Sequence, residues 1–400
     1  MEWKEVIATD YCYKVADGTH DSPKRQNKGR FLITSKHIKG PSIDFDNAYY
    51  ISEDDYQKII KRSKIDKWDV IVSMIGEYCG FCYLEDSDFT DYAVKNVGIL
   101  KVGERIKSLW LYYYLNSPDG RNQLKNTRAG SSQPYISLGS LRNLLIPEPP
   151  RDVMERTVSI LSSLDRKIEL NNKINANLEE MAQAIFKNWF VDFEPFKDSK
   201  LEDSELGMIP EGWKVGTLGD ITKNKSAKVK ERNDVKVLSP VTTGELVLSE
   251  EYFTKQVFSS SIAKYKIVNK GDFAYNPARV NIGSLGRNEF DFDGCVSPVY
   301  VVFSVLDGYE NYFDLFRKTD FFKDSVASLA IGGVRQSLSY DDLSSIEVII
   351  PSENAVEEFN NLYNQMKKTI KANKLENSRL STLRDTLLPR LMSGELEIPE

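Results

Sequence analysis

The chain carries the same module twice, and no other feature constrains its fold as strongly. Two leucine-rich segments place apolar side chains at alternating steps of three and four residues, which is the spacing along one face of a helix. The first has Leu164, Ile168, Asn171, Asn175, Leu178, Ile185 and Trp189, with Ala182 at the remaining place. Adding 202 gives Met366, Ile370, Asn373, Asn377, Leu380, Leu387 and Leu391 in the second, with Arg384 opposite Ala182. Because both asparagines recur, the two segments share more than a leucine-rich pattern.

The match continues upstream with slightly larger offsets. Trp3-Lys4 corresponds to Trp213-Lys214, Lys67–Val70 to Lys270–Phe273, and Gln133 to Gln336. Each copy is then a globular segment of roughly 150 residues followed by a helix of about 40, which is an ordinary domain size. The predicted domains are a globular unit at 1–150, a central helical spacer at 151–195, a second globular unit at 196–352 and a C-terminal helical spacer at 353–400.

Each globular segment mixes short strands with helices. Runs rich in β-branched residues predict strands at 69–73, at 97–102 and within 296–303. Ser52 precedes an acidic first turn and therefore predicts the start of a helix. A further helix is expected around 109–115, ending near Pro118.

The two leucine-rich segments predict helices from about 151 to 193 and from about 354 to 393. Their apolar stripe is narrow, which is typical of a helix that packs against one partner helix. Asparagines in such a stripe penalise slipped registers, because any other alignment buries an unpaired amide. The predicted fold is α+β, with two mixed α/β domains related by pseudo-twofold symmetry and separated by two long antiparallel coiled-coil helices. A polar linker of about 15 residues is expected to follow the first helix.

The composition of the chain limits the functions that it can have. No run of about 18 apolar residues occurs, and the N-terminus does not resemble a signal peptide, so we expect a cytoplasmic protein without a membrane span. The net charge of −6 looks unsuited to nucleic-acid binding, but local charge decides phosphate contact. Residues 14–39 hold seven basic and two acidic side chains.

The signatures of common enzymes are missing. No glycine-rich phosphate loop ends in Lys-Ser or Lys-Thr, and His20 and His37 are the only histidines. Cys79 and Cys82 lack two further metal ligands and are expected to be reduced thiols beside a strand. Asn276–Arg279 only partly matches the loop of amino-group DNA methyltransferases, and the charges at 165–167 are expected to lie on the solvated face of the long helix. We therefore expect no catalysis and no metal site in this chain.

Several motifs together resemble the specificity subunits of type I restriction-modification systems. In the globular units these are Asp17–Lys24, Leu32–Lys39, Tyr50–Tyr56 and Gly130–Gln133 running into Leu144–Pro147; in the helices they are Leu164–Ile168, Asn188–Phe193 and Thr382–Gly394. The resemblance spans the whole chain in the family's order. It departs in the second globular unit, which has no close copy of Asp17–Lys24.

The resemblance implies a DNA-binding subunit with two target recognition domains, each reading one part of an asymmetric bipartite site. It also implies that the helices set the gap between the parts and dock two modification subunits, which use S-adenosylmethionine to methylate adenine. Two restriction subunits, which use ATP and Mg2+, would complete the complex. The residues predicted for spacing and docking are Leu164, Ile168, Asn171, Asn175, Leu178, Ile185, Trp189, Ile370, Asn373, Asn377, Leu380 and Leu387.

Candidate DNA contacts combine this resemblance with residue chemistry. Base edges in the major groove are read by side chains with paired donors or acceptors, whereas lysines suit phosphates. The predicted contacts are Lys24, Arg25, Lys28, Lys36, Arg128, Ser131, Ser132, Gln133, Arg279, Asn281, Arg335 and Gln336.

Three alternatives stay open on the sequence alone. The chain could be a fused nuclease–methyltransferase, although its cofactor and catalytic motifs are not found. It could be a scaffold whose repeated helices organise other proteins. It could also be a specificity subunit that serves methylation without a nuclease partner.

Overall fold

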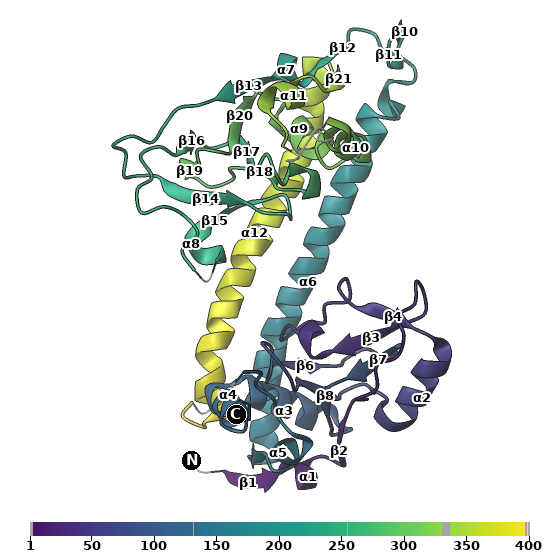
Figure 1. Ribbon diagram of the computed structural model, residues 1–400, viewed down its shortest axis with the longest axis vertical. Coiled ribbons are helices and arrows are strands. Elements are labelled where there is room, and N and C mark those ends of the chain that lie inside the picture. Colours follow the sequence, from purple (N-terminus) through teal and green to yellow (C-terminus); the bar gives the residue numbers. More distant parts are fainter. Residues whose placement is uncertain (1–2, 131, 254, 330–336, 397, 399–400) are drawn as a thin grey trace. The chain divides into compact units, whose positions relative to one another are not determined.

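A computed structural model describes residues 3–130, 132–253, 255–329, 337–396 and 398. The chain divides into two compact units, of which unit 1 comprises Met1–Asn172 with Lys374–Glu400 and unit 2 comprises Lys173–Asn373. Two long helices, α6 (Arg151–Phe190) and α12 (Glu353–Met392), each contribute one half to each unit. Each unit is therefore a globular segment together with two helical halves (Figure 1).

Three small sheets build unit 1. A four-stranded sheet has the order β2-β8-β5-β6, a three-stranded sheet has the order β4-β3-β7 with β3 and β7 parallel, and β1 pairs with β9. The strands are β1 (Lys4–Ile7), β2 (Lys14–Asp17), β3 (Arg30–Thr34), β4 (Tyr49–Ile51), β5 (Val70–Ser73), β6 (Cys82–Leu84), β7 (Tyr92–Lys95), β8 (Val97–Lys101) and β9 (Leu145–Glu148).

The helices of unit 1 follow the predicted signals. Its short and medium helices are α1 (Ala8–Tyr11), η1 (Ser35–His37), α2 (Glu53–Ser63), α3 (Arg105–Asn116), α4 (Pro118–Asn126) and α5 (Leu138–Arg142). Ser52 caps α2 by accepting a hydrogen bond from the backbone of Asp55 at 3.1 Å, as its position predicts. Pro118 ends α3 and opens α4 as its first residue, where a missing N–H costs nothing.

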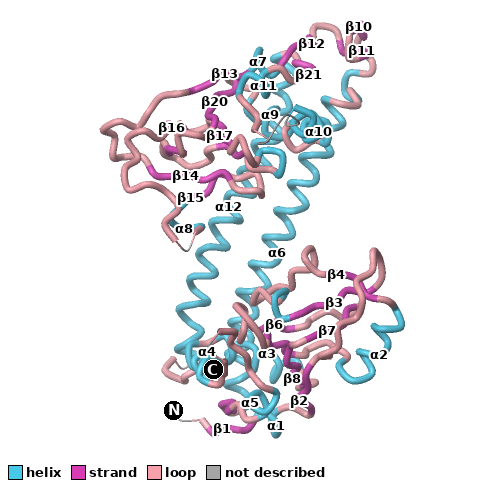
Figure 2. Tube along the Cα trace, viewed as in Figure 1, coloured by secondary structure: helices cyan, strands magenta, loops and turns pink. Residues whose placement is uncertain are grey.

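Unit 2 repeats this arrangement. Its strands are β10 (Leu201–Ser204), β11 (Gly207–Pro210), β12 (Lys214–Thr217), β13 (Thr222–Lys225), β14 (Lys236–Pro240), β15 (Leu246–Leu248), β16 (Lys266–Val268), β17 (Phe273–Tyr275), β18 (Leu285–Arg287), β19 (Gly294–Val296), β20 (Val301–Val305) and β21 (Glu347–Ile350). Its shorter helices are η2 (Glu194–Phe196), α7 (Leu218–Ile221), α8 (Ser249–Tyr252), η3 (Val280–Ile282), α9 (Glu310–Phe316), α10 (Asp320–Leu329) and α11 (Tyr340–Ser344). Figure 2 shows the mixture of strands and short helices in each unit.

The sheet topologies confirm the internal repeat. The order β13-β20-β17-β18 matches β2-β8-β5-β6, and the pair β12-β21 matches β1-β9. The parallel pair β14 and β19 likewise matches the parallel pair β3 and β7. One strand, β16, is added beside β19 in unit 2. The shared topology shows that the two globular segments have one fold, although only short motifs of their sequences agree.

The helical halves are part of each core. In unit 1, Met154, Val158 and Leu161 of α6 and Leu391 of α12 are buried in the same cluster as Trp110 of α3. In unit 2, an aromatic cluster joins Phe186 and Phe190 of α6 to Phe359 of α12 and Tyr312 of α9. Burial of such side chains stabilises the fold by about 1.5–3 kcal/mol each.

Within each unit the two helical halves pair in antiparallel register through asparagine. In unit 1, the Asn171 amide donates to the side-chain oxygen of Asn377 at 2.9 Å. In unit 2, Asn373 donates to Asn175, also at 2.9 Å. Asn171 corresponds to Asn373, and Asn175 corresponds to Asn377, each at the repeat offset of 202. The two pairs are therefore copies of one interaction. The predicted coiled-coil pairing is confirmed in each half.

The predicted seam side chains are buried or half-buried at every position. They are Leu164, Ile168, Asn171, Asn175, Leu178, Ile185 and Trp189 on α6 and Ile370, Asn373, Asn377, Leu380 and Leu387 on α12. Most residues between them are exposed, which is the pattern of a helix with one covered face.

Three local predictions need correction. The predicted polar linker after α6 is followed by strands that were not predicted, because β10 and β11 pair as a hairpin. The run at 296–303 is split between β19 and β20 at Ser297-Pro298, since proline lacks the N–H that a strand ladder needs. Asp165 does not lie on a purely solvated face: it accepts hydrogen bonds from Tyr113 at 2.7 Å and from Arg384 at 2.8 Å.

Candidate nucleic-acid interface

In unit 1, several loops meet at one edge of the four-stranded sheet. Strands β2 and β5 both run antiparallel to β8, so they point the same way and end at the same edge. The chain leaves β2 into the connection 18–29 and leaves β5 into the loop 74–81. Loops grouped at one edge of a rigid sheet are a common place for binding residues.

Ser35 joins η1 to the end of β5. Its buried hydroxyl accepts hydrogen bonds from the backbone of Met74 at 3.0 Å and of Ile75 at 3.1 Å, and donates to the carbonyl of Asn96. The Asn96 side chain in turn contacts the His20 ring at 3.2 Å. These bonds connect the 18–29 segment, η1 and the 74–81 loop into one network.

The loop 128–136, of which Ser131 lies outside the described residues, packs on the same edge. The backbone of Ile136 donates to the carbonyl of Met74 at 2.8 Å, and that of Gly76 donates to Pro134 at 2.9 Å. Ala129 and Tyr135 close the loop with two backbone hydrogen bonds. We call 18–29, η1, 74–81 and 128–136 the unit 1 loop surface.

The predicted lysines of unit 1 are exposed on this surface. Lys24 and Lys28 lie in the connection after β2, and Lys36 lies on η1. Arg25 is also exposed, with its guanidinium over the Tyr49 ring at 4.7 Å. Lys39, which belongs to the basic cluster at 14–39 but is not one of the predicted contacts, lies over the Tyr78 ring at 3.6 Å. Residues 24–39 therefore place a cluster of cations beside the 74–81 and 128–136 loops, which are distant in the sequence.

The predicted polar residues of the 128–136 loop differ in their surroundings. Ser132 and Gln133 are exposed. Arg128 instead donates from its guanidinium to the carbonyl of Cys79, and it lies 3.0 Å from where a side chain on Gly80 would begin. Gly80 has a φ of 88°, a conformation that glycine adopts without strain. Arg128 thus holds the 74–81 loop in place.

The corresponding edge of unit 2 has the same construction. The loop 276–284 follows β17 as 74–81 follows β5, and Gly283 repeats the left-handed conformation of Gly80 with a φ of 96°. The backbone of Leu338 donates to Pro277 at 3.1 Å, as Ile136 does to Met74. Arg279 and Asn281 are exposed on this loop, whereas Arg335 and Gln336 lie outside the described residues.

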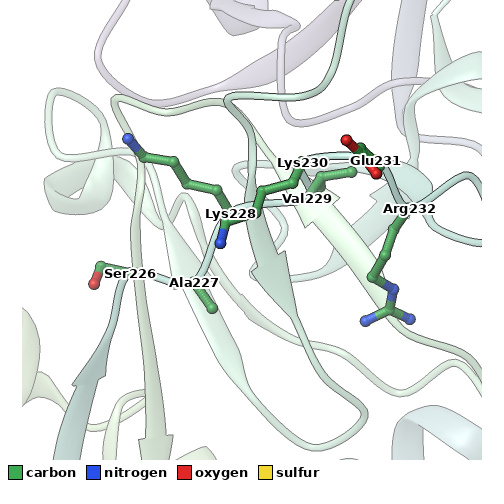
Figure 3. A pocket seen from close by; sticks show the side chains of 7 residues that line it. All are labelled: Ser226, Ala227, Lys228, Val229, Lys230, Glu231 and Arg232. Carbon is green, nitrogen blue, oxygen red and sulfur yellow. The ribbon is translucent and has the colours of Figure 1, made fainter.

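The structure also places a basic segment that sequence reasoning missed. Residues Ser226–Arg232 connect β13 to β14, where 18–29 connects β2 to β3 in unit 1. Their side chains line an open pocket and include Lys228, Lys230 and Arg232, all exposed (Figure 3). The available signal was charge alone: residues 223–236 hold six basic and two acidic side chains, but no copy of Asp17–Lys24.

The cysteines carry no recognisable site. Cys79, Cys82, Cys12 and Cys295 are free and buried, and burial raises the pKa of the Cys82 thiol to about 12. Within the described ranges, no three His, Cys, Asp or Glu side chains are grouped to hold a metal ion. In the same part of the chain, no helix has the length and apolar character needed to cross a membrane.

The sequence of the chain is similar to sequences of known proteins. Residues 23–180 match the sequence model of the type I restriction modification DNA specificity domain. The type I restriction enzyme MjaIX specificity subunit of Methanocaldococcus jannaschii is 27% identical over 307 residues, covering 74% of this chain and 70% of the relative. The HindI specificity subunit of Haemophilus influenzae is 25% identical over 422 residues, covering 84% and 88%.

The fold agrees with a solved structure. The crystal structure of the type I restriction-modification S subunit from M. genitalium aligns with a TM-score of 0.59 and 15% identity, covering 98% of this chain and 96% of that one. At this identity the likeness concerns the fold alone. Taken with the sequence matches, this likeness supports a similarity to the specificity subunits of type I restriction-modification systems along most of the chain.

Proposed function

We propose that this chain recognises an asymmetric, bipartite site in duplex DNA, with one part read by each unit. The observation that carries the proposal is the repeated topology, which gives each unit a set of loops at the same edge of the same sheet. Two copies of one reader, with different loop residues, are suited to two different base sequences. The chain itself is proposed to be non-catalytic.

The exposed side chains fall into two groups, one suited to phosphate contact and one suited to base recognition. Lys24, Lys28 and Lys36 are compact charges on flexible stems, which suit phosphate oxygens. Gln133 and Asn281 are amides that can donate to and accept from one base edge together. Arg279 can make a bidentate bond to guanine. Phosphate contacts would position the chain, and the polar side chains would select the bases.

The helices are proposed to set the separation of the two half-sites and to dock two modification subunits. Those subunits would bring S-adenosylmethionine for adenine methylation, and two restriction subunits would use ATP and Mg2+ for translocation and cleavage. The complex would act in the cytoplasm. The resemblance to specificity subunits supports these assignments, and the exposed apolar side chains Leu170 and Met181 on α6 are compatible with docking.

Exchange of one globular unit tests whether each unit recognises its own part of the DNA site. Residues 1–150 are replaced by the corresponding segment of a relative chosen to keep the apolar contacts to Met154, Val158 and Leu391. The hybrid is expressed with its modification partner, and methylated sites are mapped by sequencing. One half of the methylated motif is expected to change while the other stays the same.

A matched exchange of residues 210–352 serves as the control and should alter the other half of the motif. If either hybrid changed both halves, independent reading by the two units would be rejected. If the unmodified complex preferred no DNA sequence, a scaffold role would replace the proposed function.

A further inference from the structure

The second unit has a cationic segment where the first unit has its basic connection. Ser226–Arg232 leaves β13, and β13 runs parallel to β17 because both pair antiparallel with β20. The chain therefore leaves both strands at the same edge of the sheet, the edge that carries the 276–284 loop. This placement makes the segment a positional counterpart of residues 18–29 despite the missing sequence match.

Two of its cations are free of acidic partners. Lys225 is paired with Asp272 at 2.8 Å, and Arg232 is paired with Asp234 at 2.7 Å. For Lys228 and Lys230, no ion pair is found among the residues that the structure describes. Both side chains are exposed, so their charge is available to a ligand.

The backbone that carries these lysines is fixed. Val229 is buried with 1% of its surface exposed, and its N–H donates to the carbonyl of Tyr265 at 2.9 Å. The N–H of Lys230 donates to Ala263 at 2.9 Å. With Val229 anchored in the core, the lysines on either side of it are held outward at a set separation.

Lys230 also has an uncommon backbone conformation. Its φ is 55°, in the left-handed region that side chains with a Cβ rarely adopt. Such strain costs on the order of 1–2 kcal/mol and tends to persist at functional sites. An asparagine or glycine would fit this position with less strain, so the lysine side chain comes at a cost to stability.

We propose that Ser226–Arg232 is the phosphate-binding segment of unit 2, in which Lys228 and Lys230 contact the DNA backbone. The inference rests on the proposed function and adds the residues that anchor the second half-site. Lysine is a point charge without the fixed fork of arginine, so these contacts position the duplex and do not select bases. Arg232 is held by Asp234 and Asp293 and supports the segment from its end.

The test is the salt dependence of DNA binding by the complex of this chain with its modification partner. Each phosphate contact contributes about 0.9 to the slope of log affinity against log salt. Lys228→Ala/Lys230→Ala is therefore expected to lower the slope by about 1.8. The affinity loss should be equal for cognate and scrambled duplexes, because phosphates carry no sequence information.

The control removes two exposed charges of the same unit that lie outside Ser226–Arg232. Lys214 lies on β12, and Lys223 is the second residue of β13, before the chain reaches the loop edge. Lys214→Ala/Lys223→Ala should keep the wild-type slope. Lys228→Arg/Lys230→Arg should restore it, which separates lost charge from misfolding, and circular dichroism checks that all variants are folded.

A slope equal to wild type in the Lys228→Ala/Lys230→Ala variant, or a loss confined to the cognate duplex, would overturn the inference. Because slopes are measured on scrambled DNA as well, this result is independent of sequence preference. Absence of any preference in the wild-type complex would instead refute the proposed function.

Discussion

Asn171 gives a sharp test of how the helix pair is held in register in unit 1. Its side chain is fully buried and donates to Glu376 at 2.7 Å and to Asn377 at 2.9 Å. Its own oxygen has no hydrogen-bond partner among the described residues. Asn377 in turn donates to the exposed Asn172 at 2.8 Å. The pair is therefore buried but incompletely satisfied.

Replacing one partner should be costly. Asn171→Leu removes a hydrogen bond to the Glu376 carboxylate and leaves the Asn377 oxygen without its donor. A hydrogen bond to a charged group contributes about 1.5–3 kcal/mol, and an unsatisfied buried group costs about 1–3 kcal/mol. We expect a loss of about 2–4 kcal/mol, because Glu376 keeps its contact with Lys167 at 3.3 Å. Asn377→Leu should cost about 1–2 kcal/mol.

Replacing both partners should not be costly. Asn171→Leu/Asn377→Leu exchanges the amide pair for an apolar contact and removes the unpartnered oxygen. Replacement of both buried polar partners by apolar side chains is often neutral or stabilising. The double variant is expected within about 1 kcal/mol of wild type, which gives a coupling energy of roughly 3 kcal/mol between the two sites.

Hydrogen exchange measured by mass spectrometry on peptides covering 160–172 reports this change, because these residues belong to unit 1. A local measurement is needed because a chain of two units does not unfold as one two-state system. The same double replacement at Asn175 and Asn373 is the matched control, and it should leave exchange in unit 1 unchanged. If the Asn171→Leu/Asn377→Leu variant were as unstable as Asn171→Leu alone, side-chain hydrogen bonding would not explain the energetics of the pair.

Three further predictions concern groups whose environment is unusual. Burial raises the pKa of Cys82 to about 12, so the native chain should resist alkylation at pH 8 and label fully in urea; rapid native labelling would contradict its burial. Burial lowers the pKa of His37 below its usual 6.5, so protonation favours the unfolded chain and the thermal midpoint of unit 1 should fall as pH drops through 6.5 and below. His37→Asn should flatten this dependence while the exposed His20→Asn keeps it. Asp314 and Arg317 form a buried ion pair at 2.6 Å, so Asp314→Ala should destabilise unit 2 by about 3–5 kcal/mol in urea titrations, and a loss under 1 kcal/mol would show the pair to be dispensable.

The local patterns in the sequence determined the repeated architecture. The three- and four-residue spacing predicts α6 and α12 almost to their ends, and the asparagines at 171, 175, 373 and 377 lie in the predicted seam. The cap at Ser52 and the stop at Pro118 also lie where predicted. These features are readable because helix periodicity, capping and proline geometry depend on neighbours a few residues away.

Long-range contacts decided which segments meet at the loop edge of each unit. The charge of Ser226–Arg232 is visible in the sequence, but its equivalence to 18–29 appears only once β13 and β2 are seen in matching sheets. Arg128 looks like an open-loop residue in the sequence, yet its guanidinium meets the Cys79 carbonyl 49 positions away. Asp165 is drawn into a network by Tyr113 and Arg384, from two other helices. The contact partners of a loop residue are the segments that the folded sheet brings to the same edge. The spacing of residues along the sequence does not reveal which segments these are.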